Sequence, residues 1–111
     1  TREETEAYIV ETVRSCDPLL SSVSLRATQL EYVSNKLFNY TIDLSKSSFS
    51  STVSTIFFSC TSPGCIELSS GGFPATKNNQ TTLNCSYTIA PRLVRALQHH
   101  QTFTGKQKPL F

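Results

Sequence analysis

The sequence predicts an α+β fold: an antiparallel sheet of about four or five strands, a helix at each end of the chain and two disulfides. Apolar residues recur at helical spacing near both ends of the chain, whereas between the ends they alternate with polar residues. Four cysteines accompany this pattern in only 111 residues. A chain of this length builds one small core, so we expect a single domain over residues 1–101 and a C-terminal tail over 102–111.

The first helix is predicted over residues 1–16. Thr1 followed three residues later by Glu4 has the form of a capping box. One stripe at helical spacing carries Tyr8, Ile9, Val13 and Cys16. Pro18 pushes the residue before it out of helical conformation, so the helix should end there.

The strands are predicted between residues 19 and 89. The clearest cover 38–44 and 83–89, where strict alternation indicates one face in a core and one in water. The positions expected to face inward are Phe38, Tyr40, Ile42, Leu44, Leu83, Cys85, Tyr87 and Ile89. Weaker signals predict strands at 23–27, 30–32 and 52–59, and a short edge strand at 66–68. The less regular alternation over 52–59 suits a central strand or one with a bulge. The serine-rich residues 45–51 and the glycine-containing residues 71–79 are expected to be connections.

The second helix is predicted over residues 91–101. Pro91 fits its first position, because proline is favoured where a backbone N–H has no helical partner. Leu93, Val94 and Leu97 form a narrow apolar stripe. His99 and His100 follow near the end of this helix, and we expect both to be solvated.

The cysteines are expected to form disulfides. Four cysteines allow three pairings, of which we favour Cys60–Cys65 and Cys16–Cys85, because Cys60 and Cys65 bracket a Ser-Pro-Gly turn. A structural zinc site needs close ligand pairs in both halves of its motif, and the sequence lacks the second pair. We therefore expect no metal and no cofactor.

Three N-x-Ser/Thr sequons predict glycosylation at Asn39, Asn79 and Asn84. Asn39 and Asn84 fall on the outward phase of the two clearest strands, where a glycan would not disturb the core. An even number of cysteines together with sequons is typical of a secreted, extracellular or cell-surface protein.

Charge is low and unevenly distributed. Charged residues make up 16% of the chain, against about 25% in an average globular protein. All eight acidic residues lie within the first 67 positions, and the remaining 44 positions carry five basic residues without an acidic one. These basic residues are too dispersed for nucleic-acid binding, and no apolar run is long enough to insert into a membrane.

The sequence therefore predicts a recognition module and not an enzyme. The sequence contains no recognisable pattern for a nucleophile with its base, for a catalytic pair of carboxylates or for a phosphate-binding loop. Phe73 lies between Gly72 and Pro74 in an expected loop, and Arg92 and Arg95 flank the apolar stripe of the second helix. We expect these three residues to bind a protein partner or receptor, or another segment of the same surface, viral or parasite glycoprotein.

A second interpretation comes from a resemblance. The order of an N-terminal helix followed by antiparallel strands, with residues 29–33 preceding the strand at 38–44, resembles the cystatin superfamily. This resemblance implies inhibition of papain-type cysteine proteases. The family's Gln-x-Val-x-Gly motif is absent, because Leu30, Glu31, Tyr32 and Val33 follow Gln29.

Overall fold

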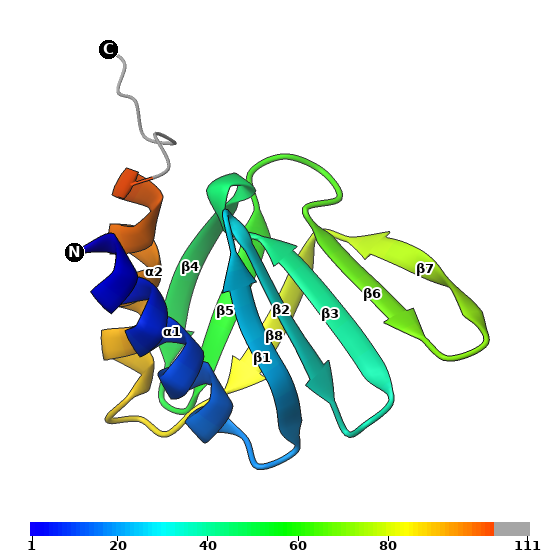
Figure 1. The fold of residues 1–111 in the computed structure, drawn as a ribbon, viewed down its shortest axis with the longest axis horizontal. Coiled ribbons are helices and arrows are strands. Elements are labelled where there is room, and N and C mark those ends of the chain that lie inside the picture. The colour runs from blue at the N-terminus through cyan, green and yellow to red at the C-terminus, as the bar shows by residue number, and fades with distance from the viewer. Residues whose placement is uncertain (104–111) are drawn as a thin grey trace.

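The computed structural model describes residues 1–103, and the predicted fold class is confirmed in this range. Helix α1 (Arg2–Cys16) begins the chain and helix α2 (Ala90–Phe103) ends the described part (Figure 1). Between them lie β1 (Leu20–Arg26), β2 (Gln29–Ser34), β3 (Phe38–Asp43), a short 3-10 helix η1 (Leu44–Lys46), β4 (Ser47–Thr52), β5 (Thr55–Cys60), β6 (Ile66–Ser70), β7 (Phe73–Asn78) and β8 (Gln80–Asn84). Thr102 and Phe103 of the expected tail belong to α2, and the rest of that tail lies outside the described residues.

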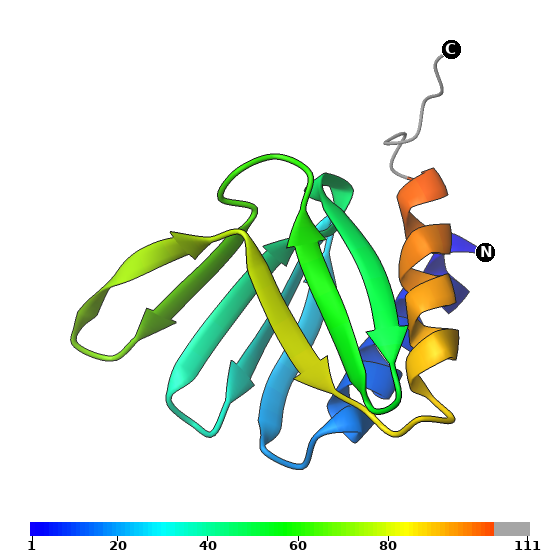
Figure 2. The ribbon, with the colours of Figure 1, turned by 180° about the vertical axis from the view of Figure 1, so that it is seen from behind.

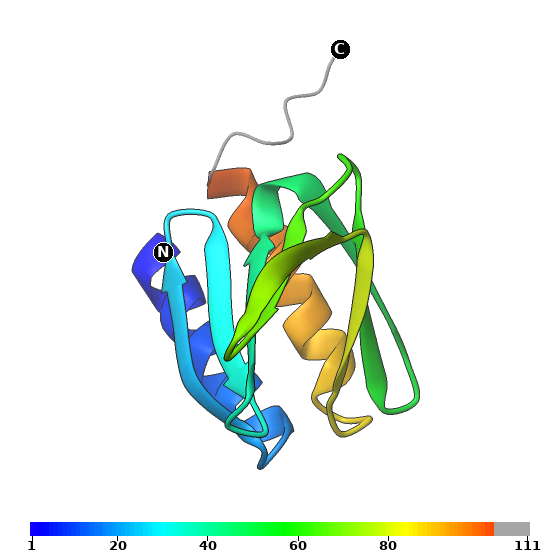
Figure 3. The same ribbon diagram turned by 90° about the vertical axis from the view of Figure 1, so that its right-hand side faces the viewer.

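The strands form two antiparallel sheets. The five-stranded sheet has the order β1-β2-β3-β6-β7, and the three-stranded sheet has the order β4-β5-β8. The chain passes between the two sheets three times: at η1 between β3 and β4, between β5 and β6, and at Asn79, the single residue between β7 and β8. Figure 2 shows the three-stranded sheet in front of the larger sheet, and Figure 3 shows α2 on the far side of both. The second sheet was not expected from the sequence.

Helix α1 forms as predicted. The Thr1 side chain accepts a hydrogen bond from the Glu4 N–H, and the Glu4 side chain completes the capping box. Ile9, Thr12 and Val13 are buried, whereas Tyr8 is 41% exposed and so does not belong to the buried stripe. The helix packs on β1 and α2.

Helix α2 is also confirmed, with one correction to its buried face. Leu93, Val94 and Leu97 are buried as expected, and the same face also buries His100 completely. The prediction that both histidines are solvated is therefore wrong for His100, because position 100 lies three residues after Leu97 on the stripe that contacts α1 and β4. His99 is exposed.

The serine-rich segment 45–51 contains η1 and most of β4, so it is not simply a connection. Within β4, Ser47 and Phe49 are buried and alternate with the exposed Ser48 and Ser50, which is the pattern of a half-buried strand. β4 pairs with β5, which is the central strand of its sheet as predicted. Val53, expected within that strand, lies in the turn between β4 and β5 and is 78% exposed.

The expected loop over 71–79 is mostly the strand β7, which follows a two-residue turn at Gly71 and Gly72. β6 therefore lies between β3 and β7 and is not an edge strand, contrary to the prediction. The predicted strand over 83–89 ends at Asn84. Its second half turns into α2, because the Ser86 carbonyl accepts hydrogen bonds from the N–H groups of Ile89 and Ala90.

Both favoured disulfides are present. Cys16, the last residue of α1, is bonded to Cys85, the first residue after β8. Cys60 and Cys65 are bonded across the turn between β5 and β6. The first disulfide joins parts of the chain 69 residues apart, and the second joins residues five apart.

Candidate functional site

Two exposed phenylalanines lie on one face of the five-stranded sheet. Phe38 on β3 lies opposite Ser70 on β6, and Ser70 lies opposite Phe73 on β7. Residues directly opposite one another in a sheet project from the same face, so these three side chains form a line across three strands. We call Phe38, Ser70 and Phe73 the aromatic row.

On the face that carries the aromatic row, the side chains of β3 and β6 become more exposed toward the row. Two residues along from the aromatic row, Tyr40 and Leu68 lie opposite each other and are half-buried. Two residues farther along, Ile42 and Ile66 lie opposite each other and are completely buried.

The aromatic row lies at the exposed end of this face. Phe38 is 36% exposed and Phe73 is 74% exposed, and the neighbouring Leu37 is half exposed. Phe38 was expected to be a core residue, and this expectation is wrong. Figure 1 shows the hairpin of β6 and β7 at the end of the molecule opposite to the two helices.

A β-bulge places Phe73 in this row. The pairing between β6 and β7 shifts between Leu68 and Ser70, so that Thr76 lies opposite Leu68 and Phe73 lies opposite Ser70. Phe73 and Thr76 are three residues apart, and without a bulge an odd spacing would place them on opposite faces. Gly72 precedes Phe73 with φ +84, a left-handed conformation that suits glycine.

The outer edge of β7 is poorly suited to pair with a strand of another protein. Among the strands within residues 1–103, β7 pairs with β6 alone, and it contains Pro74 and Lys77. Proline lacks the backbone N–H that an added strand would need, and lysine on an edge strand opposes association. The side chains of the aromatic row are therefore better suited to contact another protein than the edge of β7 is.

The three sequons lie away from the aromatic row. Asn39 is exposed and follows Phe38 along β3, so its side chain projects from the opposite face. Asn84 is exposed at the end of β8 in the other sheet. Asn79 is exposed where β7 meets β8, and its Oδ1 accepts a hydrogen bond from the Gly64 N–H at 2.8 Å. Asparagine is glycosylated through Nδ2, so this hydrogen bond leaves the modified atom available.

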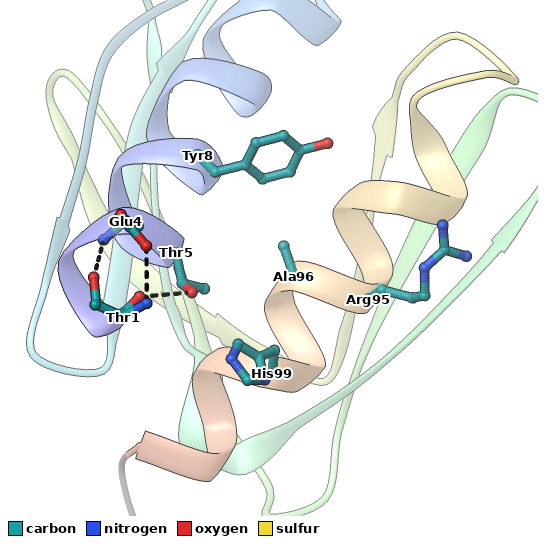
Figure 4. Close-up of a pocket in the computed structure, with 7 residues that line it drawn as sticks. All are labelled: Thr1, Glu4, Thr5, Tyr8, Arg95, Ala96 and His99. Atoms are coloured by element: carbon teal, nitrogen blue, oxygen red, sulfur yellow. Dashed lines mark hydrogen bonds and ion pairs between the residues drawn. The ribbon is translucent and has the colours of Figure 1, made fainter.

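Arg92 and Arg95 do not join Phe73 in one surface. Both arginines are exposed on α2, which lies at the opposite end of the long axis from β7 (Figure 1). Arg95 instead lines a shallow groove of about 340 Å³ between the two helices, together with Tyr8 and His99 (Figure 4). The sequence-predicted binding residues therefore belong to two separate surfaces.

A partly buried hydrogen bond joins the two helices beside this groove. His100 Nε2 lies 2.9 Å from Glu6 Oε2, and Arg2 Nε donates to the same carboxylate oxygen. The hydrogen bond with His100 is the main cause that lowers the pKa of Glu6 below its ordinary value, and Arg2 contributes to the same effect. His100 Nδ1 is buried and has no hydrogen-bond partner among residues 1–103.

Three other features were compared with the described residues: metal-ligand clusters, membrane-spanning helices and the segment that resembles cystatins. Within residues 1–103, no three His, Cys, Asp or Glu side chains gather closely enough to hold a metal ion. No helix in the same range is both long and apolar enough to cross a membrane. Residues 29–33, which carried the resemblance to cystatins, lie within β2 and are paired with β3 along their whole length.

In comparisons with known proteins, no family model, no curated protein and no solved structure matches the chain. The functional assignment therefore depends on this chain's own geometry. Reasoning from sequence singled out Phe73 as a partner-binding candidate but placed Phe38 in the core, because the alternation over 38–44 does not reveal which end of a strand is covered.

Proposed function

We propose that the chain is a non-catalytic recognition module of an extracellular glycoprotein, and that it binds a protein partner through the aromatic row. The observation that carries this proposal is the pair of exposed phenylalanines, Phe38 and Phe73, on one face of the larger sheet. Large aromatic side chains are common anchors of protein interfaces, because each removes a large apolar area from water on binding.

The extracellular setting is supported by the two disulfides and by the positions of the sequons. Disulfides persist in oxidising compartments, and all four cysteines are paired. Glycans at Asn39 and Asn84 would cover the outward faces of the two sheets and leave the aromatic row open. The partner is a separate protein or another segment of the same glycoprotein, with an apolar surface that receives the two rings.

The test is a binding measurement with glycosylated protein from a secretory host. Photo-crosslinking side chains placed at position 73 and, as a control, at position 53 should identify a partner that only position 73 captures. Val53 is a matched control, because it is 78% exposed in a hairpin turn of the other sheet. The affinity for that partner is then measured for Phe73→Ala, Phe38→Ala and Val53→Ala.

We expect each phenylalanine substitution to weaken binding by about thirtyfold, which corresponds to a hot-spot loss of about 2 kcal/mol. Val53→Ala should bind as the unchanged protein does. Undiminished binding of the Phe38→Ala, Phe73→Ala double variant would contradict the proposal. A loss of binding on removal of the Asn39 glycan, with Phe73→Ala unaffected, would place the interface on the other face of the sheet.

A further inference from the structure

The outer face of the three-stranded sheet carries one aromatic side chain among hydroxyl and amide groups. Alternation along β4, β5 and β8 brings nine residues to this face: Ser48, Ser50, Thr52, Thr55, Phe57, Ser59, Gln80, Thr82 and Asn84. Phe57 lies on the central strand, between Ser50 and Thr82, and is 36% exposed. The opposite face already buries Ile56, Phe58 and Leu83, so the fold does not need Phe57 in the core.

Asn84, the residue of the third sequon, lies on the same face and close to Phe57. Asn84 is directly opposite Thr55, and Phe57 is two residues along β5 from Thr55. Such diagonal neighbours in an antiparallel sheet have Cα atoms about 7–8 Å apart. A sugar ring attached to Asn84 Nδ2 begins within a few bonds of the backbone, so it can reach across this distance to the Phe57 ring.

We infer that Phe57 is the platform for an N-linked glycan at Asn84, and that the first N-acetylglucosamine of this glycan packs on the Phe57 ring. One face of a pyranose ring presents C–H groups, which pack favourably on the π face of an aromatic ring. Hydroxyl and amide groups surround the ring and suit the polar rim of the sugar. A hollow of about 310 Å³ along β5 and β8 is lined by Phe57, Ser59, Gln80 and Thr82 and also by their chain neighbours Phe58 and Thr81. It gives the glycan room to continue beside Phe57.

This inference rests on the extracellular setting of the proposed function but concerns a different sheet and different residues. The other exposed sequon on a strand, Asn39, lies opposite Val33 and Ser69 and has no aromatic side chain opposite it. The chain therefore contains its own control, because the glycan at Asn39 should not depend on Phe57.

The test is a double-mutant cycle for stability in protein from a secretory host. The four proteins are the unchanged chain, Asn84→Gln, Phe57→Leu and the double variant, and urea unfolding is measured with disulfides intact. Removal of the Asn84 glycan should raise the unfolding equilibrium constant by about threefold to tenfold more when Phe57 is present than when leucine replaces it. The same cycle with Asn39→Gln should show no coupling to position 57.

A spectroscopic measurement keeps the inference testable if a variant folds poorly. Protons of the first N-acetylglucosamine at Asn84 should show upfield ring-current shifts in the unchanged chain, and Phe57→Leu should remove them. Absence of both the shifts and the coupling would overturn the inference. Binding of free N-acetylglucosamine oligomers to the Asn84→Gln variant would also overturn it, by assigning Phe57 to a foreign glycan.

Site occupancy separates this inference from the proposed function. Mass spectrometry that finds Asn84 unmodified while Asn39 and Asn79 carry glycans would overturn the platform and leave recognition through the aromatic row intact. Three unmodified sequons would overturn both. Coupling between positions 57 and 84 with binding unaffected by Phe73→Ala would support the platform and refute the proposed interface.

Discussion

The two disulfides should contribute very differently to stability, because they close loops of very different length. Cys16–Cys85 joins residues 69 apart, and Cys60–Cys65 joins residues five apart. In the chain-entropy model, a disulfide stabilises the fold by restricting the unfolded chain, and its contribution grows with the logarithm of loop length. For these loops the model gives about 4.4 kcal/mol for Cys16–Cys85 and about 2.2 kcal/mol for Cys60–Cys65.

The experiment compares Cys16→Ala, Cys85→Ala with Cys60→Ala, Cys65→Ala. Both are pairwise replacements, so each leaves no free thiol, and each pair contains one largely buried and one half-buried residue. The loss of packed sulfur atoms is therefore similar in the two variants, and the difference between them reports mainly on loop closure. Free energies of unfolding come from urea denaturation, and melting temperatures from circular dichroism.

We expect the variant without Cys16–Cys85 to be about 2 kcal/mol less stable than the variant without Cys60–Cys65. In a domain of this size that difference corresponds to roughly 10 °C in melting temperature. Equal losses, or a larger loss without Cys60–Cys65, would refute the loop-entropy reasoning. The second result would mean that the short disulfide acts on the folded state by holding the corner between the two sheets.

Three further predictions concern single residues and the alternative function. Glu6→Gln should make the free energy of unfolding fall less steeply as the pH is lowered, because a carboxyl whose pKa is lowered from 4.5 by His100 and Arg2 stabilises the fold above pH 4.5 and loses this effect as the pH falls. Urea unfolding midpoints between pH 3 and 7 measure this effect. Identical pH profiles of the two proteins would contradict it. Gly72→Ala should lower the free energy of unfolding by about 1 kcal/mol, because Gly72 has a positive φ that alanine adopts only with strain. Gly71→Ala is the control, because an added Cβ meets no atom within 4 Å at either glycine, and it should leave stability nearly unchanged. Equal losses in the two variants, measured by urea unfolding, would refute the conformational explanation. In an assay of papain, micromolar protein should leave the protease fully active, and dose-dependent inhibition would instead support the cystatin-like alternative.

Much of the fold could be predicted because its signals are local. The capping box at Thr1 and Glu4 depends on residues within one helical turn. Pro18 and Pro91 mark helix boundaries through their own backbone restrictions. The pairing of Cys60 with Cys65 follows from a turn of four residues. In each case the physical cause lies within a few residues of its effect.

Other features could not be predicted because they depend on tertiary packing. Serine is a weak strand former, so β4 is specified less by its composition than by pairing with β5 and by burial of Phe49 against Phe58. His100 is buried because the helix face that contains it meets α1, where Glu6 supplies a hydrogen bond. The aromatic row depends on a bulge in β7, and the sequence around Phe73 does not identify which residue is unpaired.

The two helices place both ends of the described chain at the same end of the domain. Thr1 and His99, near the two ends of the described chain, line the same groove, so both ends of the described chain lie on one side of the domain (Figure 4). The hairpin of β6 and β7 lies at the other end of the 44 Å long axis (Figure 1). Phe73, the first residue of β7, therefore lies far from both ends of the described chain, so a partner bound there as proposed would approach from the side that faces away from Thr1 and His99.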